Sequence, residues 1–234
     1  MSGSDLDLLT RGTVEIEGRF SNSSNATFLV RIELEGDSML AVYKPEAGER
    51  PLWDFPAGLW RREVAASVLS EHLGFGLVPL TIAREDLPAG PGSLQRYVEE
   101  DPAAHFFTLR EDPQHERTLK ALAAFDVVAN NSDRKSGHVL LAEGSLWAID
   151  HGLCFHEEDK VRTVIWDYAG DPLDDEVRAG LERLLVEVPP ALIDLLSEAE
   201  VTATQRRARD LLELGALPEP DEDAPYPPYP WPLI

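Results

Sequence analysis

A polar loop enclosed by apolar runs, within residues 123–152, constrains the fold of this chain more than any other part of the sequence. Apolar residues recur at helical spacing through 118–128, and two short apolar runs at 139–141 and 146–149 flank a Glu-Gly-Ser turn signature. Residues 130–138, which lie between the helical pattern and the turn pattern, are mostly polar. The sequence therefore predicts a helix, a polar loop and a β-hairpin, in that order.

This order of elements brings two carboxylates near each other, Asp133 in the polar loop and Asp150 at the end of the hairpin. One acid of such a pair can orient an attacking hydroxyl while the other holds magnesium on nucleotide phosphates, which is the minimum equipment for phosphoryl transfer. In the alternative interpretation, Asn131 and Asp133 bond their own backbone in a capped turn. The presence of Asp150-His151-Gly152 after the hairpin favours phosphoryl transfer over a capped turn.

At these residues the chain resembles the phosphatidylinositol 3- and 4-kinase-like superfamily, which includes the HipA-like kinases. Its members carry a catalytic loop of the form Asp-Arg-His-x-x-Asn and an Asp-x-Gly metal motif, and residues 133–138 here read Asp-Arg-Lys-Ser-Gly-His. The resemblance implies a kinase that uses ATP with Mg²⁺ or Mn²⁺, with Asp133 in the catalytic position and Asp150 in the metal-binding one. Asn131 would brace the catalytic loop, and Arg134 would support it.

Two positions depart from the family pattern. Lys135 stands where the family usually has His, and His138 stands where it has the Asn that ligates the metal. Magnesium prefers oxygen ligands whereas imidazole accepts manganese more readily, so a metal site of Asp150 and His138 predicts a preference for Mn²⁺. If His138 is instead a structural residue bonded to the loop backbone, it has no effect on metal preference.

The order of elements before the polar loop predicts a kinase-like N-lobe. Apolar runs bounded by turn residues indicate strands, and a helical pattern with a stop glycine interrupts them. We therefore expect an α+β, two-lobed protein-kinase-like fold with an antiparallel-sheet N-lobe (about 13–98), a mainly helical C-lobe (about 99–217) and a tail (218–234). The expected strands are 12–18, 27–35, 39–45, 78–84 and 92–98, and the expected helices around them are 6–11 and 58–74.

Two charged residues of this lobe are candidates for nucleotide binding. Lys44 emerges from an apolar strand and resembles the lysine of the third kinase strand, which pairs with the α- and β-phosphates. Glu63, in the first or second turn of the following helix, is the candidate partner that positions Lys44. The alternatives are a lysine that snorkels at a strand end and an exposed acid favoured by the helix dipole.

Two short segments complete the predicted nucleotide site. Ser21, Ser23 and Ser24 lie between the first two strands, where hydroxyls and backbone amides can bind phosphate oxygens, although polar hairpin tips are common. Tyr97 and Val98 follow the last strand of the lobe, where backbone groups of a kinase hinge would bond adenine. The hinge assignment rests on the order of the elements alone.

The C-terminal part of the chain predicts helices and then an irregular tail. Residues 161–168 occupy the place of a substrate-facing segment. The tail is acidic and then rich in proline and aromatic residues, so we expect it to be extended and to pack on the body or on a partner. The expected helices are 174–186, 190–197 and 202–214.

Charge limits the partners of this chain. It has 43 Asp and Glu against 21 Lys and Arg, a formal net charge of −22. Such a surface repels phosphate polymers and anionic lipid headgroups, so we expect no nucleic-acid partner, no stable membrane association, and a protein or small-molecule acceptor rather than a lipid. Cys154 is the sole cysteine, and neither a signal peptide nor an apolar run of membrane length is visible, so we expect a cytoplasmic protein.

Other functions stay open at this stage. His138 could reflect a lost metal site in a nucleotide-binding pseudokinase or scaffold whose tail recruits a partner. The same residues could instead transfer the nucleotide rather than the phosphate. A metal-dependent hydrolase built on His138, His151 and His156 is a further alternative, although these residues match no zinc pattern.

Overall fold

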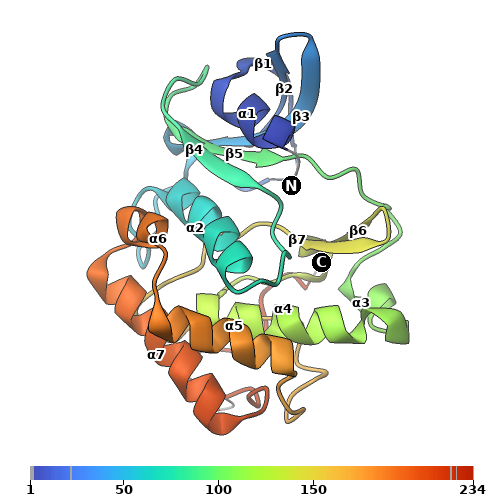
Figure 1. The fold of residues 1–234 in the computed structure, drawn as a ribbon, viewed down its shortest axis with the longest axis vertical. Helices are drawn as coiled ribbons and strands as arrows, with labels where there is room; N and C mark the ends of the chain where they lie inside the picture. The colour runs from blue at the N-terminus through green and yellow to red at the C-terminus, as the bar shows by residue number, and fades with distance from the viewer. Residues whose placement is uncertain (1–2, 22, 222, 225, 234) are drawn as a thin grey trace.

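The chain folds into a sheet lobe stacked on a helical lobe, as a computed structural model shows for residues 3–21, 23–221, 223–224 and 226–233 (Figure 1). The predicted α+β, two-lobed architecture, with an antiparallel sheet in the first lobe and mainly helices in the second, is therefore confirmed. The elements are α1 (Gly3–Arg11), β1 (Thr13–Arg19), β2 (Phe28–Leu34), β3 (Asp37–Pro45), α2 (Leu59–His72), β4 (Thr81–Arg84), β5 (Gly92–Arg96), α3 (Phe106–Leu109), α4 (Glu116–Ala129), β6 (Val139–Ala142), β7 (Ser145–Ala148), α5 (Asp175–Val186), α6 (Pro190–Leu195) and α7 (Glu198–Leu214).

The sheet of the first lobe directs Lys44 toward the second lobe. Its strand order is β1-β2-β3-β5-β4, and each neighbouring pair is antiparallel. Ala41 and Tyr43 of β3 are fully buried and pack in one cluster with Leu9 of α1. Because successive side chains of a strand point to opposite faces, Lys44 points away from α1. That face of the sheet looks toward α2 and the helical lobe (Figure 1).

Strand β4 is shorter than the sequence predicts. It begins at Thr81 instead of residue 78, because Pro79 has no N–H to donate to the sheet. The hydroxyl of Ser67 in α2 accepts a hydrogen bond from the Thr81 N–H at 3.1 Å and donates one to the Pro79 carbonyl at 3.3 Å. This stretch is therefore fastened to α2. Strand β5 ends at Arg96, so the two predicted hinge residues lie immediately beyond it.

Helix α2 has a charged cap from the preceding loop. Gly58 precedes the helix with φ 89°, a left-handed conformation that favours glycine. The Glu49 carboxylate accepts hydrogen bonds from the N–H groups of Gly58 and Trp60, both at 2.8 Å. These bonds satisfy free donors of the first turn and place a negative charge at the positive end of the helix dipole. The cap fixes the start of the helix that carries Glu63.

Helix α4 forms the centre of the helical lobe. Leu119, Leu122, Phe125 and Val128, the residues at helical spacing in the sequence, are all buried, which confirms the prediction. The helix ends at Asn130 with φ 53°, a left-handed conformation that Asn tolerates better than most residues. The polar loop begins at this turn.

The three C-terminal helices lie where the sequence predicts them, with α5 and α7 packed against each other and α7 against α4. Their boundaries differ from the predicted ones mainly in α7, which begins at Glu198 after a Ser197 cap. Among the described residues, no helix is both long enough and apolar enough to cross a lipid bilayer.

The C-terminal tail packs on the helical lobe. Its described residues form no helix or strand, in agreement with its proline content. The Pro228 carbonyl accepts hydrogen bonds from the Thr163 N–H and the Trp166 indole N–H, both at 3.0 Å. The Leu233 carbonyl accepts one from the Ser136 N–H at 2.8 Å, and the Leu233 side chain packs against the main core. Of the two predicted packing partners, the tail contacts the body of its own chain.

Candidate active site between the lobes

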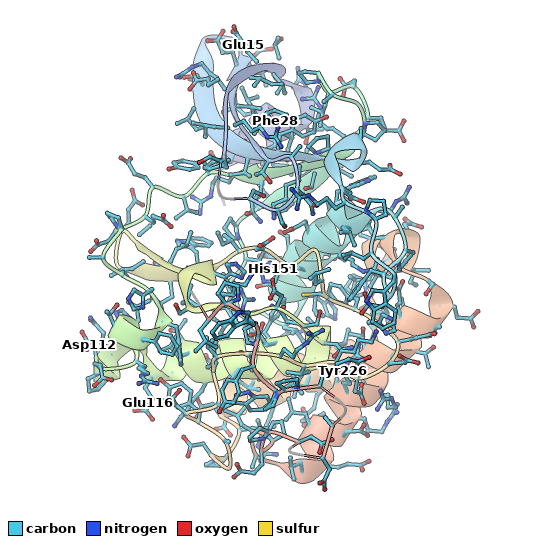
Figure 2. The ribbon with its side chains drawn as sticks, turned by 180° about the vertical axis from the view of Figure 1, so that it is seen from behind. Glu15, Phe28, Asp112, Glu116, His151 and Tyr226 are labelled. Carbon is cyan, nitrogen blue, oxygen red and sulfur yellow. The ribbon has the colours of Figure 1, made fainter. Side chains whose placement is uncertain are left out.

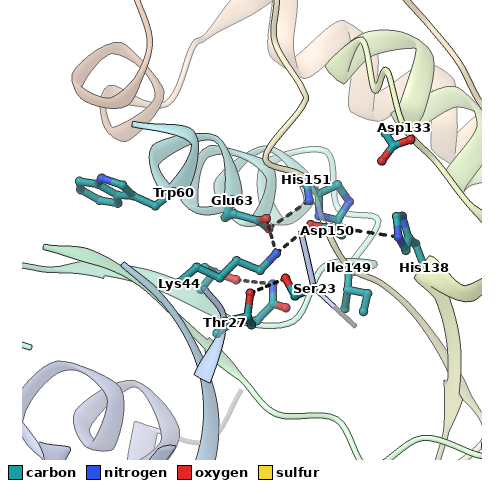
Figure 3. Close-up of polar contacts among 12 residues, drawn as sticks. Ser23, Thr27, Lys44, Trp60, Glu63, Asp133, His138, Ile149, Asp150 and His151 are labelled. Atoms are coloured by element: carbon teal, nitrogen blue, oxygen red, sulfur yellow. Dashed lines mark hydrogen bonds and ion pairs between the residues drawn. The ribbon is translucent and has the colours of Figure 1, made fainter. Parts of the chain in front are cut away.

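The Lys44 ammonium lies between two carboxylates from different lobes (Figure 3). It forms an ion pair with Glu63 of α2 and another, at 2.9 Å, with Asp150 of the Asp-x-Gly motif. Glu63 also accepts a hydrogen bond from the His151 N–H at 3.0 Å. Glu63 therefore ties the lysine of the sheet lobe to the motif after the hairpin. The structure brings together the predicted Lys44, Glu63 and Asp150.

The charges of Lys44 and Asp150 hold each other ionised. Burial lowers the pKa of Lys44, but Asp150 and Glu63 outweigh it and raise that pKa above its ordinary value. The Lys44 charge in turn lowers the pKa of Asp150 well below its usual range, against the effect of burial. A charged ammonium between two carboxylates is the form that can bind phosphate oxygens.

Asp150 is presented to the cleft by an unusual backbone conformation. Its φ is 63°, which is uncommon for a residue other than glycine and is found often at functional sites. Its side chain is 50% exposed, and Oδ2 lies 3.4 Å from Nε2 of His138. Burial lowers the pKa of His138 to about 4, so its imidazole is neutral at ordinary pH. Asp150 and a neutral His138 therefore lie close enough to share one cation.

The polar loop is held from inside by Arg134. This side chain is fully buried, and its guanidinium binds the equally buried Asp126 of α4 through contacts of 2.9 to 3.2 Å. It also donates hydrogen bonds to the Ile149 carbonyl and to His151 Nε2, both at 2.8 Å. Arg134 thus joins α4, the loop and the Asp-x-Gly motif. Its side chain lines neither of the two cavities between the lobes, and its predicted role as a support of the loop stays a prediction.

Asn131 and Lys135 set the position of Asp133. Asn131 is fully buried; its Oδ1 accepts a hydrogen bond from the Asp133 N–H at 3.0 Å, and its Nδ2 donates to Asp126 at 3.1 Å. The Lys135 ammonium lies 2.9 Å from Asp133 Oδ2. Burial raises the pKa of Asp133, and Lys135 opposes that effect. The Asp133 carboxylate is thereby held at the edge of the cleft, partly exposed.

Two adjoining cavities, of about 280 and 310 Å³, lie between the lobes and share Lys44, Asp150, Ser23 and Thr27. The first is also lined by Asp133 and by several residues of the loops after β1 and β3. The second extends toward the end of β5. Its other lining residues include Val42, Gln95, Arg96, Tyr97, Val98, His138, Leu140 and Ile149. Together they offer a polar end at the carboxylates and a more apolar end at the predicted hinge.

The predicted phosphate-loop and hinge residues are placed unevenly. Ser23 and Ser24 line the first cavity, whereas Ser21 is exposed and lines neither. Tyr97 and Val98 line the second cavity, but the Tyr97 N–H already donates to the Leu40 carbonyl at 3.1 Å. The backbone donor of Tyr97 is therefore engaged within the sheet. A hinge role for Tyr97 or Val98 stays a prediction.

In the described part of the chain, the three histidines of the hydrolase alternative do not gather at one metal site. His151 is fully buried, and its Nε2 accepts from Arg134, which leaves Nδ1 to carry the ring proton. Burial lowers the pKa of His151 well below its ordinary value. His156 instead packs edge-on against Phe55. Across the described ranges, no group of three or more His, Cys, Asp or Glu side chains could hold a metal ion.

Sequence comparison places the chain in a family. Protein Rv2133c of Mycobacterium tuberculosis is 39% identical in an alignment 266 positions long, which spans 97% of this chain and 94% of the relative. This chain belongs to the Rv2133c family. No protein-family model matches it. The identity extends over both lobes, so the relative is expected to share the whole fold.

Structural comparison places this member of the Rv2133c family among kinase-like folds. The crystal structure of a Helicobacter pylori proinflammatory kinase, CtkA, matches with a TM-score of 0.51 and 11% identity over 86% of this chain and 92% of that one. At this identity the match shows a shared fold. A structure of hydra Fam20 with sugar matches with a TM-score of 0.46 and 12% identity over 86% and 85% of the two chains, which is too weak to support a conclusion.

Two residues near the site of this Rv2133c-family chain were not predicted. Asp126 is a lone acid in an apolar helical run, and because a buried carboxylate requires partners, that pattern could have indicated a hidden ion pair. Lys135 carried no such signal beyond its departure from the family motif. Its contact with Asp133 depends on how the loop turns.

Proposed function

We propose that this chain is an ATP-dependent phosphotransferase with a hydroxyl acceptor. The observation that carries the proposal is the ion-paired group of Lys44, Glu63 and Asp150, which joins the two lobes at the cavity that Asp133 also lines. A cation at the base of a cleft, with one acid to position it and two further acids facing the same space, is the arrangement that phosphoryl transfer uses. The kinase-like fold and the resemblance of residues 133–138 support the same assignment.

Each residue has a distinct part in this proposal. Lys44 binds phosphate oxygens of ATP, and Glu63 fixes its position. Asp133 accepts a hydrogen bond from the acceptor hydroxyl and takes its proton, while Asn131 holds the backbone of Asp133 in place. A divalent cation, when bound, would neutralise phosphate charge, and Asp150 with His138 would hold it.

The donor set fits a nucleotide-borne cation. Magnesium and manganese bound to nucleotides keep water and phosphate oxygens as most of their ligands, so one carboxylate and one imidazole from the protein are sufficient. In the present arrangement His138 accepts from the Lys135 N–H at Nδ1, at 3.4 Å, and Nε2 carries the proton toward Asp150. Ligation through Nε2 would require the other tautomer of the neutral ring.

We also propose that the acceptor is a protein or a small molecule. The net charge of −22 opposes approach to an anionic bilayer, and this argument applies to any phosphate-rich surface. Incubation with γ-labelled ATP and a cell extract, followed by separation of protein, lipid and small-molecule fractions, identifies the class. Label in the lipid fraction would contradict the proposal.

Thermal melting with ATP and either cation tests nucleotide binding directly. A ligand that binds only the folded state stabilises it, by about 2.7 kcal/mol at a hundred times its dissociation constant. We expect ATP with Mn²⁺ or Mg²⁺ to raise Tm, and ADP release to depend on Asp133. Absence of both effects would refute phosphotransferase function.

A nucleotide-binding pseudokinase is the second candidate, because His138 replaces an oxygen ligand and Lys135 forms an ion pair with the proposed base. Under this alternative, ATP raises Tm but neither ADP release nor transfer exceeds that of an Asp133→Asn variant. The two candidates are separated by that single comparison.

A further inference from the structure

The C-terminal tail is bonded to the two segments that surround Asp133. The Leu233 carbonyl accepts from Ser136, which follows Lys135 in the polar loop. The Pro228 carbonyl accepts from Thr163 and from Trp166, in the segment after the Asp-x-Gly motif. The tail therefore crosses from one of these segments to the other.

These two segments also hold each other. The Arg134 N–H donates to the Arg162 carbonyl at 3.0 Å, and the Val164 N–H donates to the Arg134 carbonyl at 3.1 Å. The Thr163 hydroxyl donates to Asp126 at 3.2 Å, so the same buried carboxylate binds both Arg134 and Thr163. The tail adds hydrogen bonds to each of the two segments, to Ser136 in one and to Thr163 and Trp166 in the other.

The tail also holds a cation near Asp133. The Arg162 guanidinium lies over the Tyr226 ring at 5.5 Å from its centroid, and its Nε is buried without a hydrogen-bond partner. Among the described residues Arg162 forms no ion pair, yet its charge lowers the pKa of Asp133 against the larger effect of burial. Figure 2 shows Tyr226 in the helical lobe, on the side of the molecule where His151 is also seen. The backbone of Arg162 is bonded to both neighbours of Ser132 and Asp133 in the loop, because its N–H donates to the Asn131 carbonyl at 3.0 Å and its carbonyl accepts from the Arg134 N–H at 3.0 Å.

The nucleotide cavities are separate from these contacts. No described residue of the tail lines either cavity between the lobes. The tail contacts described above all go to the helical lobe, around Asp133, and none goes to Lys44 or the predicted hinge. Loosening the tail is therefore expected to act on transfer and to leave nucleotide binding intact.

We propose that the C-terminal tail is a positioning element for phosphoryl transfer, in which Tyr226 holds Arg162 and the tail backbone holds the segments around Asp133. This inference rests on the proposed function. In physical terms, the tail limits the motion of the loop that carries the base, and a small misplacement of a reacting group is enough to slow the chemical step.

Point variants of the full-length chain test this role. Tyr226→Ala removes the ring beneath Arg162, and Tyr226→Phe keeps the ring as a conservative control. Trp231→Ala is a matched tail control, because Trp231 is 87% exposed. For each variant, ADP release is measured at varied ATP concentration with Mn²⁺, together with the rise in Tm that ATP causes.

We expect Tyr226→Ala to lower kcat about threefold to tenfold, the range for loss of one partly desolvated cation–π contact. KM for ATP and the ATP-induced rise in Tm should not change. Tyr226→Phe and Trp231→Ala should match the wild type. Hydrogen exchange of the Ser136 and Thr163 amides should become faster in Tyr226→Ala alone.

The inference would be overturned if Tyr226→Ala changed neither kcat nor the amide exchange rates. It would also be overturned if kcat and KM changed together, and by the same factor, in both Tyr226→Ala and Tyr226→Phe. These outcomes leave the wild-type ATP effects in place. Failure of the proposed function is recognised differently, because the wild type itself would then show neither ADP release nor a rise in Tm.

Discussion

The two sides of the cleft are held together by different kinds of interaction. On the proposed nucleotide side, Lys44, Glu63 and Asp150 form ion pairs that face the cleft, and Asp150 is half exposed. On the proposed acceptor side, Asp126 and Arg134 form a fully buried ion pair, and Asn131 links Asp126 to the backbone of Asp133. The first arrangement can rearrange around a ligand, whereas loss of one member of the second leaves the other charge buried and unpaired. Substitutions on the two sides should therefore separate binding, catalysis and stability.

The largest effect is expected on the proposed acceptor side, at the proposed base Asp133. Asp133→Asn keeps the shape of the side chain but removes the proton acceptor, so turnover should fall by about 10²- to 10⁴-fold. ATP affinity, measured by calorimetry, should stay close to that of the wild type. A variant that kept more than about a tenth of the wild-type rate would contradict the assigned role.

The next effect concerns stability rather than turnover. Asp126→Ala leaves the buried Arg134 without its partner, and the free energy of unfolding should fall by about 3–5 kcal/mol. Asp210→Ala is the control, because its pair with Arg206 is exposed and should contribute at most about 0.5 kcal/mol. Urea denaturation measures both. If both variants lost the same free energy of unfolding, burial of the ion pair would not explain its contribution to stability.

On the nucleotide side, Lys44→Ala should weaken ATP binding about tenfold to a hundredfold, the range for one charge-assisted contact. It should also lower stability, because Glu63 is only 3% exposed and would lose its cation. Lys120→Ala is the control: Lys120 has ion pairs of 2.6 and 3.0 Å with Glu116 and Asp171, and it lines neither nucleotide cavity. Calorimetric titration measures the ATP affinity of both variants. Equal affinities would show that Lys44 does not bind ATP.

The smallest effect is expected at His138. His138→Asn should shift the ratio of manganese-supported to magnesium-supported turnover severalfold toward magnesium, because an amide oxygen suits the harder cation. Since the pKa of His138 is lowered to about 4, the ring stays neutral as pH falls to that value, and no loss of activity near pH 6.5 should come from its protonation. An unchanged metal ratio in the variant would indicate a structural histidine.

Much of the fold could be predicted because its signals are local. The periodicity that placed α4, the turn residues between β6 and β7, and the stop glycine after α2 each act within a few residues along the chain. The direction of Lys44 followed from the same kind of local signal. In a strand whose alternate residues are buried on one face, a lysine next to a buried residue points to the opposite face. Boundaries were less certain, as Pro79 at the start of β4 illustrates.

The sequence by itself determined the order of strands, helices and loop, and with it the two acids Asp133 and Asp150 at one cleft. The sequence also suggested the pairing of Lys44 with Glu63, but only the tertiary structure decided the other pairings. The Asp126–Arg134 pair, the Glu49 cap on α2 and the contacts of the tail with Ser136 and Thr163 join residues that are distant in sequence or hidden by burial. Such contacts depend on desolvation and on the packing of whole elements, and neither quantity can be obtained from residue spacing.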